Sequence, residues 1–269
     1  MGKRIVIVLL LAGILGGMLA LPAGAVDLQL AAPSAVLMDL ATGTVLYETN
    51  SHERLAPASV TKVMTLLLIM EAVDSGKISW QDTVTASEAA AAKGGSQVYL
   101  KVGETMSVEE MVKSITVSSA NDCACAMAEF LAGSEAGFVE KMNARAKELG
   151  CTDTTFSCVH GLYDYGNVST AEDLAKIAAA CYANETYMQA ANPLPYTLPA
   201  TNLHQNERTI KATNLMLDPE YAYHRDYVRG MKTGFTTLAG RCFVTFAQQD
   251  GHTYGLVVLG SDMNNIYRE

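Results

Sequence analysis

Residues 59–74 have the sequence SVTKVMTLLLIMEAVD, and this stretch decides the fold. Apolar side chains fill most positions after Lys62 instead of forming one stripe, and the run stops before Gly76. A helix that is apolar on all sides belongs in the interior of a protein. The stretch therefore predicts a buried central helix that starts just after Pro57.

Strand patterns lie on both sides of this helix. Residues 35–49 contain an apolar run, the turn Ala41-Thr42-Gly43 and a second short run, which predicts a hairpin. Residues 242–247 and 254–259 flank Asp250-Gly251 and predict a second hairpin. Strands at both ends with helices between them predict an α+β fold, in which one antiparallel sheet is built from N- and C-terminal strands and carries a helical lobe.

The middle of the chain has the end signals of helices. Ser107 with Glu110, and Ser169 with Glu172, match capping boxes. A further helix is predicted from about residue 135 to 149, ending at Gly150. Residues 84–104 are predicted to be a loop region. Because ligand sites favour the clefts between lobes, we expect the functional site between the sheet and the helices.

Composition limits the possible functions. The chain has 269 residues, 49% apolar and 17% charged, with a net charge of −9. These values are typical of a globular protein with a substantial core and exclude a mainly disordered chain. The charges form no basic stripe, so no nucleic-acid partner is expected.

The first residues predict export. Lys3 and Arg4 precede the apolar run 5–21, and Ala23-Gly24-Ala25 then offers small residues for a signal peptidase. We interpret residues 1–25 as a signal peptide and residues 26–269 as the catalytic domain outside the cytoplasm. The alternative is an uncleaved membrane anchor, which needs about 20 apolar residues.

Six cysteines occur in the chain, without a Cys-x-x-Cys pair and without a histidine at metal spacing. Zinc is therefore not expected. In an oxidising compartment Cys151 and Cys158 are the pair most suited to a disulfide, because only a short segment separates them. Buried thiols are the equally open alternative.

Ser59 and Lys62 are the first candidates for chemistry. Residues three apart in a helix share one face, so the lysine amine can reach the serine hydroxyl. A serine needs an adjacent base to act as a nucleophile, and a lysine serves when burial or a nearby positive charge lowers its pKa. A capping serine beside a solvated lysine is the alternative interpretation.

Two further motifs accompany this pair. Ser119-Ala120-Asn121 lies between two predicted helices and offers a hydroxyl to pass on a proton and an amide to hold a peptide group. Its alternative interpretation is a helix N-cap. Lys232-Thr233-Gly234 precedes the second hairpin and offers a cation and a hydroxyl to a carboxylate, while the glycine permits close approach of substrate. Its alternative is an exposed strand start.

In this order the motifs match the set Ser-x-x-Lys, Ser-x-Asn and Lys-Thr-Gly of penicillin-recognising serine enzymes. From about residue 32 to residue 269 the chain resembles the low-molecular-mass D-alanyl-D-alanine carboxypeptidases, serine peptidase family S11. The resemblance rests on the motifs and on residues 56–65, 100–104, 120–122, 160–162 and 230–236.

The resemblance implies roles for single residues. Ser59 is the expected acylated nucleophile, Lys62 its base and Ser119 the proton relay to the leaving group. The expected substrate contacts are Asn121 for the peptide, Lys232, Thr233 and Arg268 for the terminal carboxylate, Gly234, and an oxyanion hole made by the N–H groups of Ser59 and Phe235. His160 borders the cleft in this family, and a structural role is favoured for it.

The resemblance also implies ligands. The expected substrate is a peptidoglycan stem pentapeptide that loses its terminal D-alanine, and β-lactam antibiotics are the expected inhibitors. No cofactor or metal is implied, and no protein partner can be inferred. Family members usually continue into a closing helix, a β-rich domain and an amphipathic anchor, whereas this sequence stops at Glu269. The sequence is interpreted either as a fragment of a longer family member or as a short form of the family.

Three alternative functions stay open. A class A β-lactamase shares the first and third motifs, but it needs a glutamate followed four residues later by asparagine. Lys176 follows Glu172 and Gln189 follows Glu185, so neither glutamate fits. A D,D-endopeptidase or transpeptidase uses the same site. An inactive wall-binding or penicillin-sensing module is the alternative from another class of protein.

Overall fold

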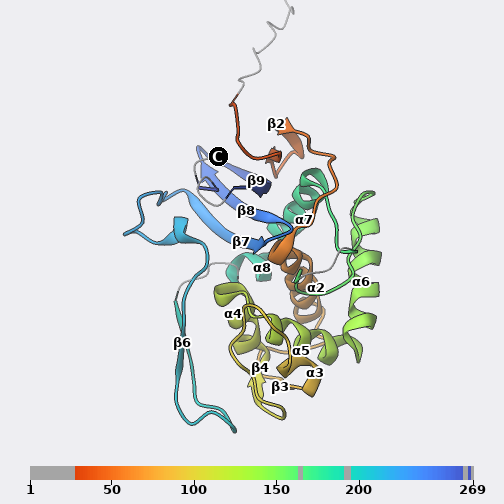
Figure 1. Ribbon diagram of the computed structural model, residues 1–269, viewed down its shortest axis with the longest axis vertical. Coiled ribbons are helices and arrows are strands. Elements are labelled where there is room, and N and C mark those ends of the chain that lie inside the picture. The colour runs from red at the N-terminus through yellow and green to blue at the C-terminus, as the bar shows by residue number, and fades with distance from the viewer. Residues whose placement is uncertain (1–27, 163–165, 191–194, 263–265, 268–269) are drawn as a thin grey trace, which may run out of the picture. The chain divides into compact units, whose positions relative to one another are not determined.

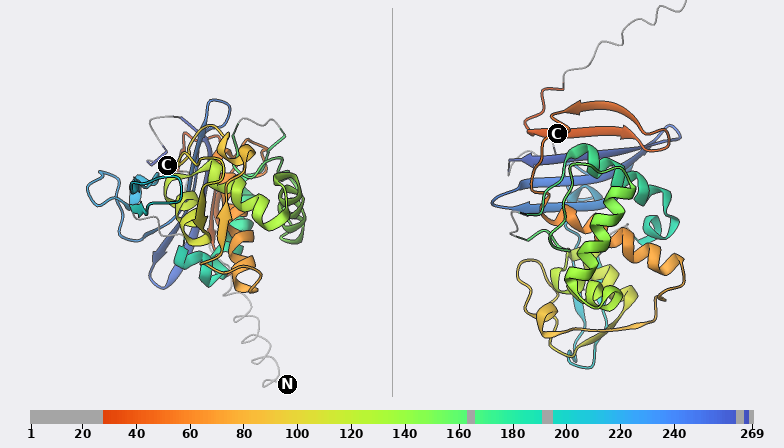
Figure 2. Two further views of the ribbon diagram at one scale, coloured as in Figure 1. Left: turned by 90° about the horizontal axis from the view of Figure 1, so that it is seen from below. Right: turned by 90° about the vertical axis from the view of Figure 1, so that its right-hand side faces the viewer.

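A five-stranded antiparallel sheet joins the two ends of the described chain. Its strand order is β2-β1-β9-β8-β7. In Figure 2 the orange N-terminal strands lie beside the blue C-terminal strands. The strands are β1 (Ser34–Asp39), β2 (Thr44–Thr49), β7 (Val228–Thr236), β8 (Gly240–Gln249) and β9 (His252–Ser261). Both predicted hairpins are confirmed, and so is the α+β fold with a sheet built from both ends.

The computed structural model describes residues 28–162, 166–190, 195–262 and 266–267. Residues 31–269 belong to one compact unit. The predicted signal peptide, residues 1–25, lies outside the described residues. Within the part that is described, no helix has the length and apolar character needed to cross a membrane.

Helices cover the sheet and form the lobe beside it (Figure 1). The helix α7 packs on strands β1 and β9, and α2 packs between α7 and the lobe helices α4 and α5. The helical elements are η1 (Ala58–Thr61), α2 (Lys62–Asp74), α3 (Glu88–Ala91), α4 (Val108–Ser118), α5 (Asn121–Ala132), α6 (Glu135–Glu148), α7 (Ala171–Ala183), α8 (Glu185–Ala190) and η2 (Leu215–Leu217). The remaining strands pair as β3 (Thr83–Thr85) with β4 (Thr105–Ser107), and β5 (Tyr196–Leu198) with β6 (Arg208–Ile210).

The predicted central helix is confirmed, with a tighter first turn. Residues 58–61 form the 3-10 turn η1, and α2 continues from Lys62. Val63 and Leu67, four residues apart, share one face of α2, Ile69 lies on another face, and all three are buried. This burial on several sides anchors the helix start that carries Ser59 and Lys62 in the core.

The helix ends predicted for α4 and α6 are confirmed, and the start predicted for α7 is wrong by one residue. Ser107 and Glu110 form the predicted capping box of α4, and α6 ends just before Gly150. The N-cap of α7, however, is Thr170 and not Ser169. The backbone of Ser169 pairs instead with Leu55, through bonds of 2.8 and 2.9 Å. This long-range bridge keeps Ser169 extended, so the helix starts one residue later.

The predicted disulfide is not formed, and the alternative of buried thiols holds. All six cysteines are buried thiols. The Sγ atom of Cys151 donates to the carbonyl of Asp173 at 3.5 Å, whereas Cys158 Sγ accepts from the N–H of Gly161 at 3.2 Å. The two sulfur atoms therefore have separate partners.

We expect six thiols per chain when the unreduced protein is unfolded and titrated with a thiol reagent. The folded protein should react slowly, because burial raises the pKa of Cys151 and of Cys242 to about 12 and keeps both protonated near neutral pH. A count of four thiols in the unfolded, unreduced protein would reveal one bridge and contradict this structure.

Candidate active site

Ser59 and Lys62 meet at the start of the central helix. The Nζ atom of Lys62 lies 3.0 Å from Ser59 Oγ, within hydrogen-bond distance. The turn η1 that carries Ser59 packs against strands β7 and β8. Figure 1 shows α2 starting beside β7. The predicted contact between Ser59 and Lys62 is present, and the turn that carries Ser59 packs against the sheet.

Burial changes the chemistry of Lys62. Its side chain is fully buried, and its Nζ also donates to the carbonyl of His160 at 2.9 Å. Burial lowers the pKa of Lys62 well below its usual value, and the positive charge of Lys232 lowers it further. This lowered pKa makes the neutral amine of Lys62, which can accept a proton from a serine hydroxyl, easier to form.

His160 supports this site through its backbone. Its ring Nδ1 accepts from the N–H of Leu162 at 3.1 Å, and its Nε2 lies 3.4 Å from a Glu135 oxygen. Glu135 in turn pairs with Lys93 at 2.6 Å. These contacts fix the segment whose carbonyl holds Lys62, which agrees with the structural role favoured for His160.

Gly161 lies against the turn η1 that carries Ser59, and its substitution should break the contact. A Cβ atom at this position would overlap the carbonyl oxygen of Ala58 and lie 2.7 Å from Thr61 Oγ1. The backbone φ of +78° adds strain for any other residue. We expect Gly161→Ala to lower the free energy of unfolding by roughly 3 kcal/mol or more, measured by urea unfolding.

The matched control for that variant is Gly76→Ala. Gly76 has φ +69° but no atom within 4 Å of an added Cβ, so only the backbone strain of about 1–2 kcal/mol applies. Equal losses in the two variants would contradict the close contact between Gly161 and the turn η1.

Ser119 and Asn121 join helices α4 and α5 at the other wall of the site. Ser119 ends α4 in the left-handed conformation, φ +63°, and Ala120 is the N-cap of α5, without a side-chain cap. The N-cap interpretation of this motif is therefore wrong. Ser119 Oγ and Asn121 Oδ1 are buried without a hydrogen-bond partner in the described structure. Buried polar atoms of this kind need a partner, which a bound ligand can supply.

The loop before this motif is tied to it. Asn121 Nδ2 donates to the carbonyl of Gly94 at 2.7 Å, and the backbone N–H of Asn121 donates to Ser96 at 2.7 Å. An added Cβ at Gly95 would lie 2.8 Å from Asn121 Nδ2. The Gly94-Gly95-Ser96 loop is thus held beside the asparagine.

The third motif lies on β7, the edge strand of the sheet, as its interpretation requires. Lys232 is buried, its Nζ donates to the carbonyl of Thr233 at 2.9 Å, and burial lowers its pKa to about 7. Thr233 Oγ1 donates to Thr213 Oγ1 at 2.9 Å. An added Cβ at Gly234 would lie 2.9 Å from the backbone N of Ser59, so glycine lets β7 approach Ser59 this closely.

A cavity of about 510 Å³ opens between these elements. It brings together Ser59, Ser119, Thr233, Gly234 and Phe235 from the predicted set. Lys62, Asn121 and Lys232 do not line this cavity; they are buried, and each is one to three positions along the chain from a residue that does. Arg268 lies outside the described residues.

The three sequence motifs account for only part of the lining of this cavity. The residues that sequence reasoning did not single out are Ser96, Ala212, Thr213, Leu215, Tyr221, Tyr223, Arg241, Ile266 and Tyr267. The dense tyrosines of residues 221–227 were the available signal for an aromatic wall. Rings of Tyr221, Tyr223 and Tyr267 contact one another, with centroids 5.7 Å apart for Tyr221 with each of the other two.

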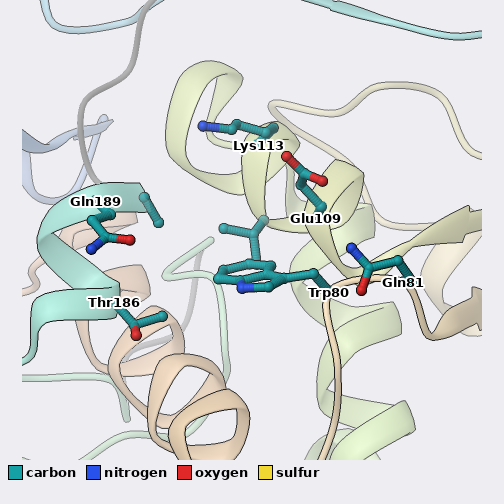
Figure 3. Close-up of a pocket in the computed structure, with 8 residues that line it drawn as sticks. Trp80, Gln81, Glu109, Lys113, Thr186 and Gln189 are labelled. Carbon is teal, nitrogen blue, oxygen red and sulfur yellow. The ribbon is translucent and has the colours of Figure 1, made fainter.

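A second cavity, of about 210 Å³, lies between the Trp80 segment, α4 and α8 (Figure 3). The Trp80 ring lines this cavity together with Glu109, Lys113 and Gln189. None of the three motifs contributes to this second cavity, whereas all three contribute to the first one. In the described ranges no group of His, Cys, Asp and Glu side chains could hold a metal ion.

Comparisons with known proteins agree with this geometry. The family model described as D-alanyl-D-alanine carboxypeptidase matches residues 22–263. DacF of Bacillus subtilis, a D-alanyl-D-alanine carboxypeptidase, is 44% identical over 230 residues, which are 86% of this chain and 57% of that protein. The chain thus spans little more than half the length of this curated relative.

Solved structures extend the likeness to three dimensions. PBP3 of Streptococcus pneumoniae, described as a peptidoglycan synthesis regulatory factor, superposes with a TM-score of 0.80 at 30% identity, covering 88% of this chain and 68% of that one. Penicillin-binding protein D2 of Listeria monocytogenes, in its ampicillin-bound form, gives a TM-score of 0.75 at 29% identity, covering 88% of this chain and 93% of that one.

Proposed function

This chain belongs to the D-alanyl-D-alanine carboxypeptidase family, and from that membership we propose that it removes the terminal D-alanine from peptidoglycan stem pentapeptides. The observation that carries the proposal is the 3.0 Å contact between Ser59 Oγ and the buried amine of Lys62. A buried amine with a lowered pKa beside a hydroxyl at a helix start is the arrangement that serine acylation needs.

The first half of the reaction acylates Ser59. The neutral amine of Lys62 takes the hydroxyl proton while Oγ attacks the carbonyl carbon of the penultimate D-alanine. The N–H groups of Ser59 and Phe235 stabilise the oxyanion. The C–N bond then breaks, and the leaving amine of the terminal D-alanine receives a proton through Ser119. The unpartnered Ser119 Oγ in the cavity wall supports this relay.

The second half releases the shortened peptide. A water molecule attacks the ester carbon, its proton passes to Lys62, and Ser59 regains its hydroxyl. Asn121 holds the peptide group, and Thr233 and Lys232 receive the terminal carboxylate beside Gly234. β-Lactams acylate the same serine and block it, a role supported by the ampicillin-bound relative.

The β-lactamase alternative lacks a supporting contact. Glu172, one of the two glutamates considered for it, lies on α7 and pairs with His52 at 2.6 Å and with Lys176 at 3.2 Å. Neither glutamate lines the cavity of Ser59 within the described residues. The proposal also places residues 26–269 outside the cytoplasm after removal of residues 1–25, since the substrate is part of the cell wall.

The test is release of D-alanine from a stem pentapeptide by the purified chain. We expect stoichiometric D-alanine and tetrapeptide, with inhibition by penicillin. A chain that binds penicillin covalently but releases no D-alanine from pentapeptide or cross-linked dimer would be a sensor, and the proposal would fail. Cleavage confined to the cross-linked dimer would favour the endopeptidase.

A further inference from the structure

Arg241 is the one charged side chain among the described residues that line the Ser59 cavity. It lies at the start of β8, and its Cα is paired in register with Phe235 of β7. Thr233, two residues before Phe235, is on the same face of β7, because side chains alternate along a strand. A long side chain at position 241 therefore reaches toward the Thr233 hydroxyl diagonally across the two strands.

The guanidinium of Arg241 is held but not neutralised by the described structure. Its central carbon lies 5.4 Å from the centroid of the Phe235 ring, a cation–π arrangement. Its Nε is buried and has no hydrogen-bond partner. Within the described ranges, no aspartate or glutamate forms an ion pair with Arg241.

The surroundings of Arg241 fit a carboxylate. Burial raises the pKa of Tyr267, while the positive charge of Arg241 opposes that rise, so the guanidinium acts on the same wall of the cavity. The ring of Phe235 covers one face of the guanidinium, and the N–H edge stays available for a planar anion.

We propose that Arg241 binds the terminal carboxylate of the substrate and sets the preference for a free C-terminal D-alanine, together with the Thr233 hydroxyl, which would turn its proton from Thr213 Oγ1 to the carboxylate. This inference rests on the proposed function, because the carboxylate is that of the stem peptide. Arg241 is then a specificity residue: an amidated or extended peptide would leave its buried N–H without an acceptor.

The test compares two peptides that differ only at the C-terminus, one with a free carboxylate and one amidated. We measure kcat/KM for both with the unmodified chain and with Arg241→Gln. The variant should lose roughly 10- to 100-fold with the free acid, the range of a lost charge-assisted hydrogen bond, and change little with the amide. Arg241→Lys should recover part of the loss, since the charge is kept without the planar geometry.

Two controls make the result specific. Arg229→Gln removes an exposed arginine of β7 that is bonded to backbone carbonyls, and it should leave the acid-to-amide ratio unchanged. Arg268→Gln tests the other arginine assigned to the carboxylate. Three results would overturn the proposal. In Arg241→Gln, kcat/KM falls equally on both peptides or falls on neither, or the preference for the acid over the amide is lost in Arg268→Gln alone. Thermal unfolding of each variant identifies a folding defect.

A failure of the proposed function would be visible separately. If the unmodified chain releases D-alanine from neither peptide, that function is wrong. Arg241 is then judged by the rate of covalent labelling with a penicillin and with its methyl ester. A lower rate with the acid alone in Arg241→Gln supports the carboxylate role, and equal rates overturn it.

Discussion

Replacement of Ser59 by alanine is expected to abolish both D-alanine release and covalent labelling by penicillin. Only the attacking oxygen is removed, so the loss in kcat should be at least ~10³-fold, as when the nucleophile of a serine enzyme is removed. The variant should stay folded, because the turn η1 is held by the buried neighbours Ala58, Val60 and Thr61. Turnover and labelling are measured on the same preparation.

The matched control is Ser75→Ala at the other end of α2. Ser75 Oγ donates to the carbonyl of Ala72 at 3.2 Å and lies outside the cavity lining. This variant removes a hydroxyl from the same helix and should keep full activity. Retained turnover in Ser59→Ala would show that another group is the nucleophile.

The second large effect concerns the base. Lys62→Met keeps an unbranched side chain in the buried position but removes the amine, so kcat/KM should fall by at least ~10²-fold. Two effects on stability oppose each other, because the cost of burying the amine is removed while the buried carbonyl of His160 loses its donor, so thermal unfolding of the variant is measured beside its rate. Lys77→Met removes a lysine just beyond α2 whose Nζ donates to the carbonyl of Leu131, and it should not alter the rate.

The pH dependence follows from the two lysines. The pKa of Lys62 is lowered by burial and by Lys232, and its neutral form is the active one, so kcat/KM should rise with pH through that pKa. Lys232 acts as a cation, and burial lowers its pKa to about 7, so kcat/KM should fall again as the pH rises through about 7 in the free enzyme. A profile without the rise on the acidic side would contradict a titrating Lys62.

The fold could be predicted from local patterns because these patterns are strong. The apolar run of residues 59–74 is stable only in the protein interior, because it is apolar on all sides of a helix. Asp250-Gly251 between two apolar runs predicts a hairpin turn, because these residues tolerate the positive φ that such a turn requires. The start of α7 was missed by one residue, because the bridge between Leu55 and Ser169 joins segments far apart in the sequence. No local signal reports such a bridge.

The sequence predicted those parts of the candidate site whose residues are close together in the chain. It did not predict the parts that pairing between strands of the sheet brings together. Ser59 and Lys62 meet because three residues separate them along one turn. Arg241 enters the cavity only through its register with Phe235 across two strands, which depends on the turn between β7 and β8. Tyr267 joins the wall from the chain end, where no motif marks it.

The central claim is that Ser59 is the acylated residue, and mapping of the penicillin adduct tests it most directly. The chain is labelled with a penicillin, quenched in acid, digested and analysed by mass spectrometry. We predict one penicilloyl group per chain, carried on Ser59 and absent from Ser59→Ala. An adduct carried on Ser119 or on any other residue would contradict the account.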